Sequence, residues 1–200
     1  MKLLLSALML AAAPAFAATA VVGQPAPAFS VSDASGKAVS LADFKGKTVV
    51  LEWVNPGCPY VRKHYDSANM QATQKGAAGQ GVVWLAVNST AQEHYDYKKP
   101  ADMAAWMQSQ KAAATHTLMD SDGKIGKAYG ARTTPHMYVV DAKGTLAYAG
   151  GIDDKATANA ADVKTAKNYV NAALGDVLAG KAVAQAVTRP YGCSVKYSDG

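Results

Sequence analysis

Two apolar runs in the first half of the chain restrict its fold more than any other feature. Residues 48–54, TVVLEWV, and residues 81–88, GVVWLAVN, are almost wholly apolar and rich in β-branched or aromatic side chains. Such runs are typical of strands that are buried on both faces of a sheet. The segment between them has the apolar spacing of a helix. Two buried strands joined by a helix predict a parallel pair in a helix-covered sheet.

The segment between these strands starts with an Asn-Pro-Gly turn and predicts one helix that ends near Gly76. Further helices are expected at 101–114 and 162–179, and a hairpin at Asp141-Ala142-Lys143-Gly144. The stretch before residue 48 alternates turn signals with short apolar pieces, which indicates a β extension that contains a hairpin. The predicted fold class is therefore α/β, with a mixed central β-sheet flanked by helices and an N-terminal β extension.

The first 17 residues, MKLLLSALMLAAAPAFA, have the three-part layout of a secretory signal peptide. They begin with a lysine, continue with an apolar run and end in Ala-Phe-Ala. We expect cleavage after Ala17, one domain over residues 18–200 and a periplasmic or secreted location. The apolar run is shorter than the roughly 20 residues of a membrane-spanning helix. No later stretch approaches that length, so no membrane span is expected in the mature chain.

The charge of the chain argues against one class of partner. It has 20 Lys plus Arg against 15 Asp plus Glu, a formal net charge of +5. The basic residues are spread along the sequence without an arginine-rich run, so no nucleic-acid partner is expected.

Two cysteines, Cys58 and Cys193, admit three interpretations, of which the first is an inert structural disulfide. A disulfide between them would close most of the chain into one loop. In the chain-entropy model this would stabilise the fold by roughly 4 to 5 kcal/mol. The second interpretation is chemical, because Cys58 stands where a strand passes into a helix. There the helix dipole and the N–H groups of Tyr60 and Val61 favour a thiolate, which attacks disulfides. We predict that Cys58 is a nucleophile.

The third interpretation is a metal-binding module. Cys58, His136 and Cys193 offer thiolate and imidazole ligands suited to copper or zinc. The chain lacks a paired-cysteine or His-x-x-x-His spacing, so no cofactor and no metal site enter the main prediction. His94 and His116 are expected at the surface or in loops.

The sequence resembles the thioredoxin superfamily and, more narrowly, the peroxiredoxin-like redoxins of the AhpC/TSA type. Three stretches carry the resemblance: GQPAPAFSVSD, the segment from LEW through Cys58 to GVVWLAVNS, and YGARTTPHMYVVDAKGTLAYAG. The resemblance implies a thioredoxin-like fold and a thiol-dependent oxidoreductase, with an antioxidant role among the expected activities. The implied partners are a protein or small-molecule thiol or disulfide substrate and a thiol reductant.

The resemblance also implies roles for residues near Cys58. Pro135 corresponds to the cis-proline that packs against the active-site cysteine, and its neighbour Thr134 would offer a backbone edge to an extended substrate. Glu52 lies six residues before Cys58, like the buried carboxylate of thioredoxins. It would act as a proton acceptor whose pKa is raised by burial. The alternative is a strand-end glutamate that reaches solvent or pairs with a lysine.

The roles predicted for the remaining residues follow from departures from the family pattern. Val61 replaces the second cysteine of thioredoxins, so Cys193 in the tail motif RPYGCSVKY is predicted to be the resolving thiol. Peroxiredoxins carry a proline seven residues and a threonine three residues before their cysteine, where this chain has Leu51 and Asn55. Peroxide reduction is therefore not the expected activity. Asn55, by its amide, and Arg132, by its charge, are predicted to contact the substrate.

Overall fold

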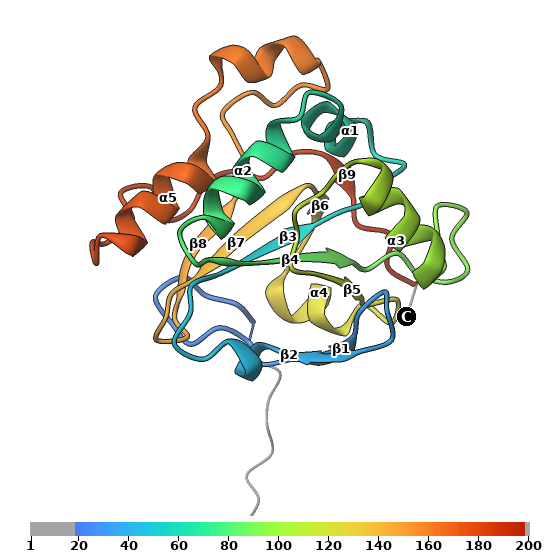
Figure 1. Cartoon of the computed structure of the whole chain (residues 1–200), viewed down its shortest axis with the longest axis horizontal. Helices are drawn as coiled ribbons and strands as arrows, with labels where there is room; N and C mark the ends of the chain where they lie inside the picture. The colour runs from blue at the N-terminus through green and yellow to red at the C-terminus, as the bar shows by residue number, and fades with distance from the viewer. Residues whose placement is uncertain (1–18, 199–200) are drawn as a thin grey trace, which may run out of the picture.

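A computed structural model describes residues 19–198, and the predicted signal peptide lies outside these residues. A mixed five-stranded sheet with the order β5-β4-β3-β7-β8 forms the centre of the molecule (Figure 1). Its strands are β3 (Val49–Trp53), β4 (Val83–Asn88), β5 (His116–Met119), β7 (His136–Val140) and β8 (Leu146–Gly150). Strand β3 pairs parallel with β4 and antiparallel with β7. The predicted mixed α/β fold is confirmed.

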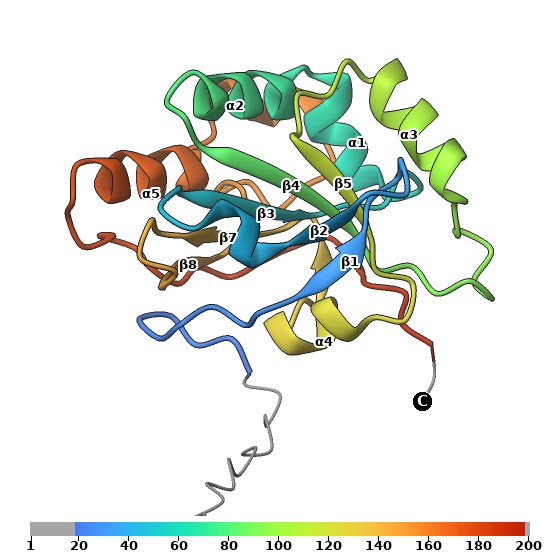
Figure 2. The ribbon, with the colours of Figure 1, turned by 60° about the horizontal axis from the view of Figure 1, so that its bottom comes forward.

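The sheet is covered on both faces, as Figure 2 shows. One face packs against α1 (Pro59–Asp66), α2 (Asn69–Ala78), α3 (Pro100–Ser109) and α5 (Tyr169–Leu178). The other packs against α4 (Lys124–Tyr129) and the hairpin of β1 (Ser30–Ser32) and β2 (Ala38–Ser40). Alternation along β3 divides its side chains between the two cores. Val50 belongs to the core under α1 and α2, and Leu51 belongs to the core beside α4.

The C-terminal tail returns to the middle of the molecule. After the 3-10 segment η2 (Ala160–Thr165) and α5, the chain reaches β9 (Cys193–Ser194). Strand β9 forms a separate two-stranded antiparallel sheet with β6 (Thr133–Thr134), which directly precedes β7 (Figure 1). A 3-10 turn, η1 (Leu41–Phe44), links the N-terminal hairpin to the central sheet. The tail thus closes over the end of the sheet where β3 meets α1.

Two helix predictions need correction. The single helix expected up to Gly76 is two helices, because Ala68 adopts a left-handed conformation with φ 59° and separates α1 from α2. Helix α2 then continues to Ala78. The helix expected over 162–179 begins only at Tyr169, where the Asn168 side chain accepts a hydrogen bond from the N–H of Asn171 and caps the helix.

Helix α3 is also shorter than predicted. It ends at Ser109 rather than at residue 114, and Lys111 has a left-handed φ of 52° that stops the helix. His116, expected at the surface or in a loop, is half-buried in an edge strand. His116 opens β5, and its Nδ1 lies 2.8 Å from a carboxylate oxygen of Asp33.

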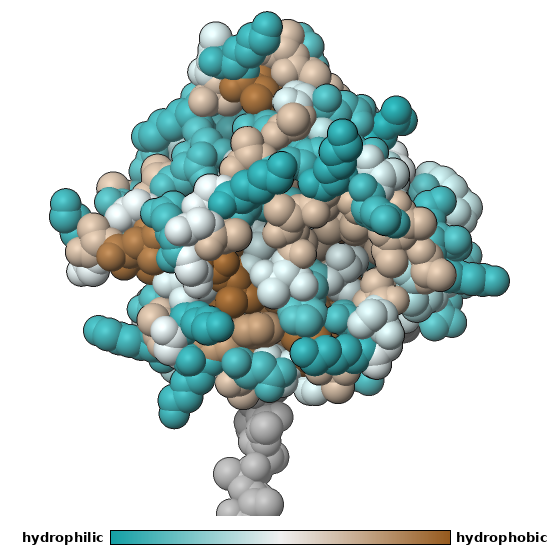
Figure 3. Space-filling view, viewed as in Figure 1, coloured by the Kyte–Doolittle hydropathy of each residue, from teal (hydrophilic) through white to brown (hydrophobic). Residues whose placement is uncertain are grey.

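The surface seen in Figure 3 is mostly hydrophilic or mixed, with small apolar patches, one of them over the end of α5 at the left. Leu178, the last residue of that helix, is exposed. Among the described residues, no helix combines the length and the apolar character that crossing a bilayer requires.

The break between α1 and α2 gives a stability prediction. A left-handed conformation costs an alanine about 1 kcal/mol or more and costs glycine little. Ala68→Gly is therefore expected to raise the free energy of unfolding by about 0.5 to 1 kcal/mol, as measured by urea unfolding. The matched control is Ala72→Gly at an exposed position inside α2, which should lower it by about 0.5 to 1 kcal/mol. Equal losses for both variants would contradict this account of the break.

Candidate functional site

Cys58 is the N-cap residue of α1, in the turn that connects β3 to this helix, and its exposed fraction is 2%. A tight turn holds it there. The Asn55 side chain accepts a hydrogen bond from the N–H of Gly57 at 2.8 Å, and the Asn55 carbonyl accepts one from the N–H of Cys58 at 3.0 Å. Pro59 starts the helix at a position that needs no N–H donor. The turn therefore directs the sulfur inward, into the core under α1.

The Cys58 sulfur contacts the segment that precedes β7. Its thiol donates to the carbonyl oxygen of Thr134 at 3.0 Å. The Thr134–Pro135 peptide bond is cis, as the family resemblance implied. No side-chain capping hydrogen bond forms at the N-cap, so the N–H groups of Tyr60 and Val61 do not hold the sulfur as expected. The hydrogen bond of the Cys58 thiol goes to the Thr134 carbonyl oxygen instead.

The tail places the second cysteine beside the first. Cys193 pairs with Thr134 and Ser194 with Thr133 in the β6–β9 ladder. Both cysteines are free thiols. Burial and then the neighbouring Cys58 thiol raise the pKa of Cys193 to about 12. Two thiols that are separated by most of the chain are thus direct neighbours, and Cys193 holds its proton at neutral pH.

Glu52 is completely buried on the face of the sheet that packs against α1 and α2. Its carboxylate accepts hydrogen bonds from Trp84 Nε1 at 2.7 Å, the Tyr65 hydroxyl at 2.9 Å and Gln74 Nε2 at 3.1 Å. Burial raises the pKa of Glu52 to about 7 against the opposing effect of these three donors. The alternative of a strand-end glutamate that reaches solvent or a lysine is wrong. Within the described residues, no hydrogen bond joins this carboxylate to either cysteine.

The two other predicted contact residues have different surroundings. Asn55 is buried, and its amide nitrogen donates to the Asp96 carboxylate at 3.3 Å in addition to its role in the turn. Arg132 is exposed. Its carbonyl accepts from the N–H of Val195 in the tail at 3.1 Å, so its backbone helps to hold the tail. Contact of either side chain with a substrate stays a prediction.

The three ligands of the metal interpretation do not form a site. The Nδ1 of buried His136 lies 3.2 Å from the backbone nitrogen of Arg132 and 3.1 Å from the Tyr138 hydroxyl. Burial, followed by the charge of Arg132, lowers the pKa of His136 to about 3. Across residues 19–198, no three His, Cys, Asp or Glu side chains are grouped so that they could hold a metal ion.

Sequence reasoning missed a buried polar cluster that holds the tail. Lys63 and His64 on α1, Asp153 after β8 and Tyr191 in the tail meet under the helix. Helical spacing gives a hint for His64, which lies three residues after the buried Val61, but none for Lys63, which lies two residues after it. Nothing local marks Asp153 or Tyr191 as their partners.

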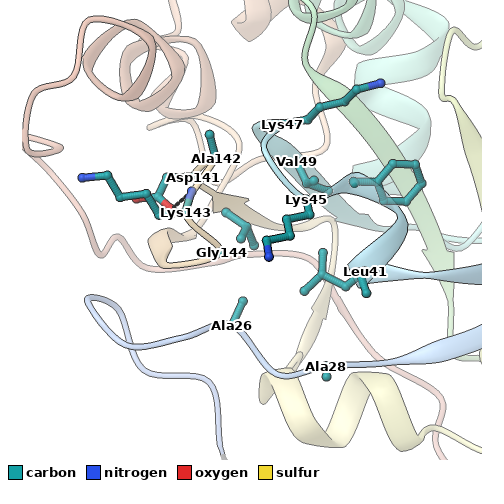
Figure 4. A pocket seen from close by; sticks show the side chains of 13 residues that line it. Ala26, Ala28, Leu41, Lys45, Lys47, Val49, Asp141, Ala142, Lys143 and Gly144 are labelled. Carbon is teal, nitrogen blue, oxygen red and sulfur yellow. Dashed lines mark hydrogen bonds between the residues drawn. The ribbon is translucent and has the colours of Figure 1, made fainter.

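Two hollows differ in their relation to Cys58. One of about 350 Å³ opens beside Gly57 and is lined by Arg62, Asp66, Asp96, Lys98 and Trp106, among others. The other, of about 280 Å³, is shown in Figure 4 and is lined by Leu41, Lys45, Val49 and the β7–β8 turn. Val49 begins β3 and Cys58 follows the end of that strand, so of these two hollows only the first lies at the end of β3 next to Cys58.

Comparisons with known proteins agree with this geometry. The model of the AhpC/TSA family matches residues 22–149. The thiol-disulfide oxidoreductase ResA of Bacillus thuringiensis subsp. konkukian is 28% identical over 132 residues, which are 62% of this chain and 66% of ResA. This chain therefore spans slightly less than two thirds of that relative. The thiol:disulfide interchange protein DsbE of Yersinia pestis is 28% identical over 148 residues, 71% of each chain.

Solved structures show the same fold. A hypothetical protein from Sinorhizobium meliloti 1021 aligns with a TM-score of 0.76 and 26% identity, covering 91% of this chain and 97% of that one. An uncharacterized conserved protein from Geobacillus kaustophilus aligns with a TM-score of 0.77 and 24% identity, covering 90% and 94%. These alignments include the C-terminal region, which the family match at residues 22–149 does not reach.

The buried carboxyl of Glu52 should make stability depend on pH. Its pKa of about 7 lies above the ordinary 4.5, so the folded chain keeps this proton where the unfolded chain has lost it. The stabilising contribution is therefore complete below pH 4.5, falls as the pH rises to about 7 and is then constant. Over this range, the free energy of unfolding of wild type minus that of Glu52→Gln should fall by up to about 3 kcal/mol.

Urea unfolding between pH 4 and 8 measures this difference. The control Glu93→Gln, at an exposed position, should leave the pH dependence unchanged. A difference between wild type and Glu52→Gln that is flat across the range would contradict the assignment.

Proposed function

The chain belongs to the AhpC/TSA family, and from that premise we propose that it is an extracytoplasmic thiol-disulfide oxidoreductase with Cys58 as nucleophile and Cys193 as resolving thiol. The observation that carries the proposal is the pairing of Thr134 with Cys193, which sets two free thiols side by side at a helix N-terminus. The names of the ResA and DsbE relatives describe the same chemistry and support it.

The proposed reaction has two exchange steps. The Cys58 thiolate attacks one sulfur of a substrate disulfide, which breaks the substrate S–S bond, forms a mixed disulfide and releases one substrate thiolate. The Cys193 thiol then gives its proton to the substrate thiolate already released and attacks the Cys58 sulfur, which forms the Cys58–Cys193 disulfide and releases the second substrate thiolate. Two electrons pass from the protein dithiol to the substrate. An external dithiol reductant returns the protein to its starting state.

The surroundings of Cys58 suit a disulfide better than a peroxide. Leu51, at the position of the peroxiredoxin proline, belongs to the core on the opposite face of the sheet. Asn55, at the position of the threonine, already uses its side-chain amide for hydrogen bonds to the N–H of Gly57 and to the Asp96 carboxylate. We therefore propose a protein or small-molecule disulfide as substrate, with Thr134 as the docking edge and Arg132 beside it. The signal-like residues 1–17 support a periplasmic or secreted location for the domain of residues 18–200.

Single-cysteine variants test the proposed roles. When the reduced protein is mixed with oxidised glutathione, Cys193→Ser should retain a one-to-one glutathione adduct on Cys58, because no resolving thiol remains. Wild type should end with an internal disulfide and no adduct. Cys58→Ser should react at least about tenfold more slowly, because the raised pKa of Cys193 leaves little thiolate. Intact-protein mass spectrometry distinguishes these products.

Two results would count against the proposal. An adduct that forms equally fast in Cys58→Ser would exclude Cys58 as the nucleophile. A wild-type internal disulfide that resists dithiothreitol would favour the structural disulfide over exchange chemistry.

Glu52 is proposed as the proton acceptor, and a pH profile tests this role. In a Cys193→Ser background, the rate of Cys58 alkylation by iodoacetamide should include a component that rises through about pH 7, where Glu52 loses its proton. Glu52→Gln should remove that component, and Glu93→Gln should keep it. Identical profiles in all three proteins would remove Glu52 from the mechanism.

A further inference from the structure

The tail is held at the site by contacts on both sides of Cys193. On one side, the Tyr197 hydroxyl donates to the carbonyl of Ala131 at 2.7 Å. On the other, the Tyr191 hydroxyl enters the buried cluster under α1. Between them, Cys193 and Ser194 form the β9 strand. The position of the second thiol is therefore set by side chains that do not themselves react.

Tyr191 is the shared partner of three buried side chains. Its hydroxyl donates to the Asp153 carboxylate, lies 3.1 Å from His64 Nε2 and accepts from Lys63 Nζ at 3.3 Å. Lys63, His64 and Asp153 are each 2% exposed or less. Lys63 Nζ also donates to the carbonyl of Lys155 at 2.6 Å and lies 3.7 Å from the Asp153 carboxylate. Losing the Tyr191 hydroxyl would leave buried polar groups without a hydrogen-bond partner, which is unfavourable in free energy.

This cluster connects the tail to the helix of the nucleophile. Lys63 and His64 lie on α1, whose N-cap is Cys58. An anchor on α1 therefore holds the tail relative to the helix that positions the first thiol. A shift of Tyr191 would move Cys193 relative to Cys58 without touching either sulfur.

Gly192 allows the tail to lie directly on β6. Its φ is +140°, and a Cβ at this position would stand 2.1 Å from the Thr134 oxygen and 2.7 Å from the Thr134 carbonyl carbon. Both atoms are backbone and cannot swing away. The β6–β9 pairing therefore requires glycine at residue 192.

An unpaired strand edge is a place where an extended segment of another chain can add by backbone hydrogen bonds. The edge of Thr133–Thr134 is already occupied by the protein's own Cys193–Ser194. Resting on the proposed function, we propose that Tyr191 is the positioning residue that fixes the tail on β6, where Cys193 stands in for the cysteine of an extended protein substrate. The tail is then both the resolving arm and a cover that a substrate strand must displace.

The first experiment measures how strongly Cys193 is held at Cys58. The effective concentration of the two thiols is obtained by equilibrating the protein with mixtures of reduced and oxidised glutathione. Tyr191→Phe should lower it about tenfold, the effect expected for one charge-assisted hydrogen bond. Tyr95→Phe is the matched control, because Tyr95 is 87% exposed, and it should have no effect. A loss of fold stability alone would not change this equilibrium within the folded protein.

The second experiment measures how much the tail limits the access of a reagent to Cys58. In a Cys193→Ser background, Gly192→Ala should raise the rate of Cys58 alkylation by iodoacetamide about tenfold or more, since the tail can no longer lie on β6. Gly180→Ala is the control, because Gly180 also has a positive φ, of +69°, but its added Cβ meets open space. Its alkylation rate should match that of the background protein.

The outcomes separate this proposal from the proposed function. Alkylation requires no disulfide exchange, so a faster rate in Gly192→Ala supports the cover even if no substrate disulfide is reduced. If Tyr191→Phe leaves the effective concentration unchanged and Gly192→Ala leaves the alkylation rate unchanged, the tail is neither positioned by Tyr191 nor a cover, and the proposal is overturned.

Discussion

The arrangement of the site depends on one short backbone pairing, between Thr133–Thr134 and Cys193–Ser194. An isolated two-stranded ribbon is marginally stable in water at best, and this one has only two residues in each strand. It persists because hydroxyl groups on both sides of it are anchored in the body of the protein. Tyr191 reaches the cluster beneath α1, and Tyr197 reaches the carbonyl of Ala131. The proximity of the two thiols is therefore a property of the tail and not of the turn that carries Cys58.

A second constraint is the polar content of the core under α1 and α2. Glu52 lies in the middle of β3, wholly buried, and an unpaired carboxylate there would be strongly destabilising. Three donors from α1, α2 and β4 converge on it, so the cost of burial is partly offset and the packing of these elements is tied to one group. The same core holds Cys58. A group that changes charge near neutral pH thus shares a core with the proposed nucleophile.

The sequence predicted what depends on local pattern. The apolar runs at 48–54 and 81–88 form β3 and β4, and the proline-bounded turn places Cys58 at the start of a helix. These features could be predicted because strand burial and turn formation depend on residues that are adjacent in the sequence. The break at Ala68 was missed, since alanine is a strong helix former and only the packing of α1 against α2 requires a left-handed residue there. The partners of Tyr191 were missed for a different reason: they lie 38 to 128 residues away in the chain, and no periodicity links them.

The position of Val61 explains why a distant cysteine matters. In a helix-borne pair of cysteines, the second thiol is fixed one turn from the first by the helix itself. Here that place holds a fully buried valine in the core under the sheet, which contributes packing and no chemistry. Moving the second thiol to a tail removes it from the rigid scaffold and makes its presence conditional on docking. In the proposed mechanism, the strand edge that presents Cys193 is also the one that a substrate strand would use, so the resolving thiol and the substrate would compete for Thr134. Such competition cannot occur when both cysteines lie on one helix.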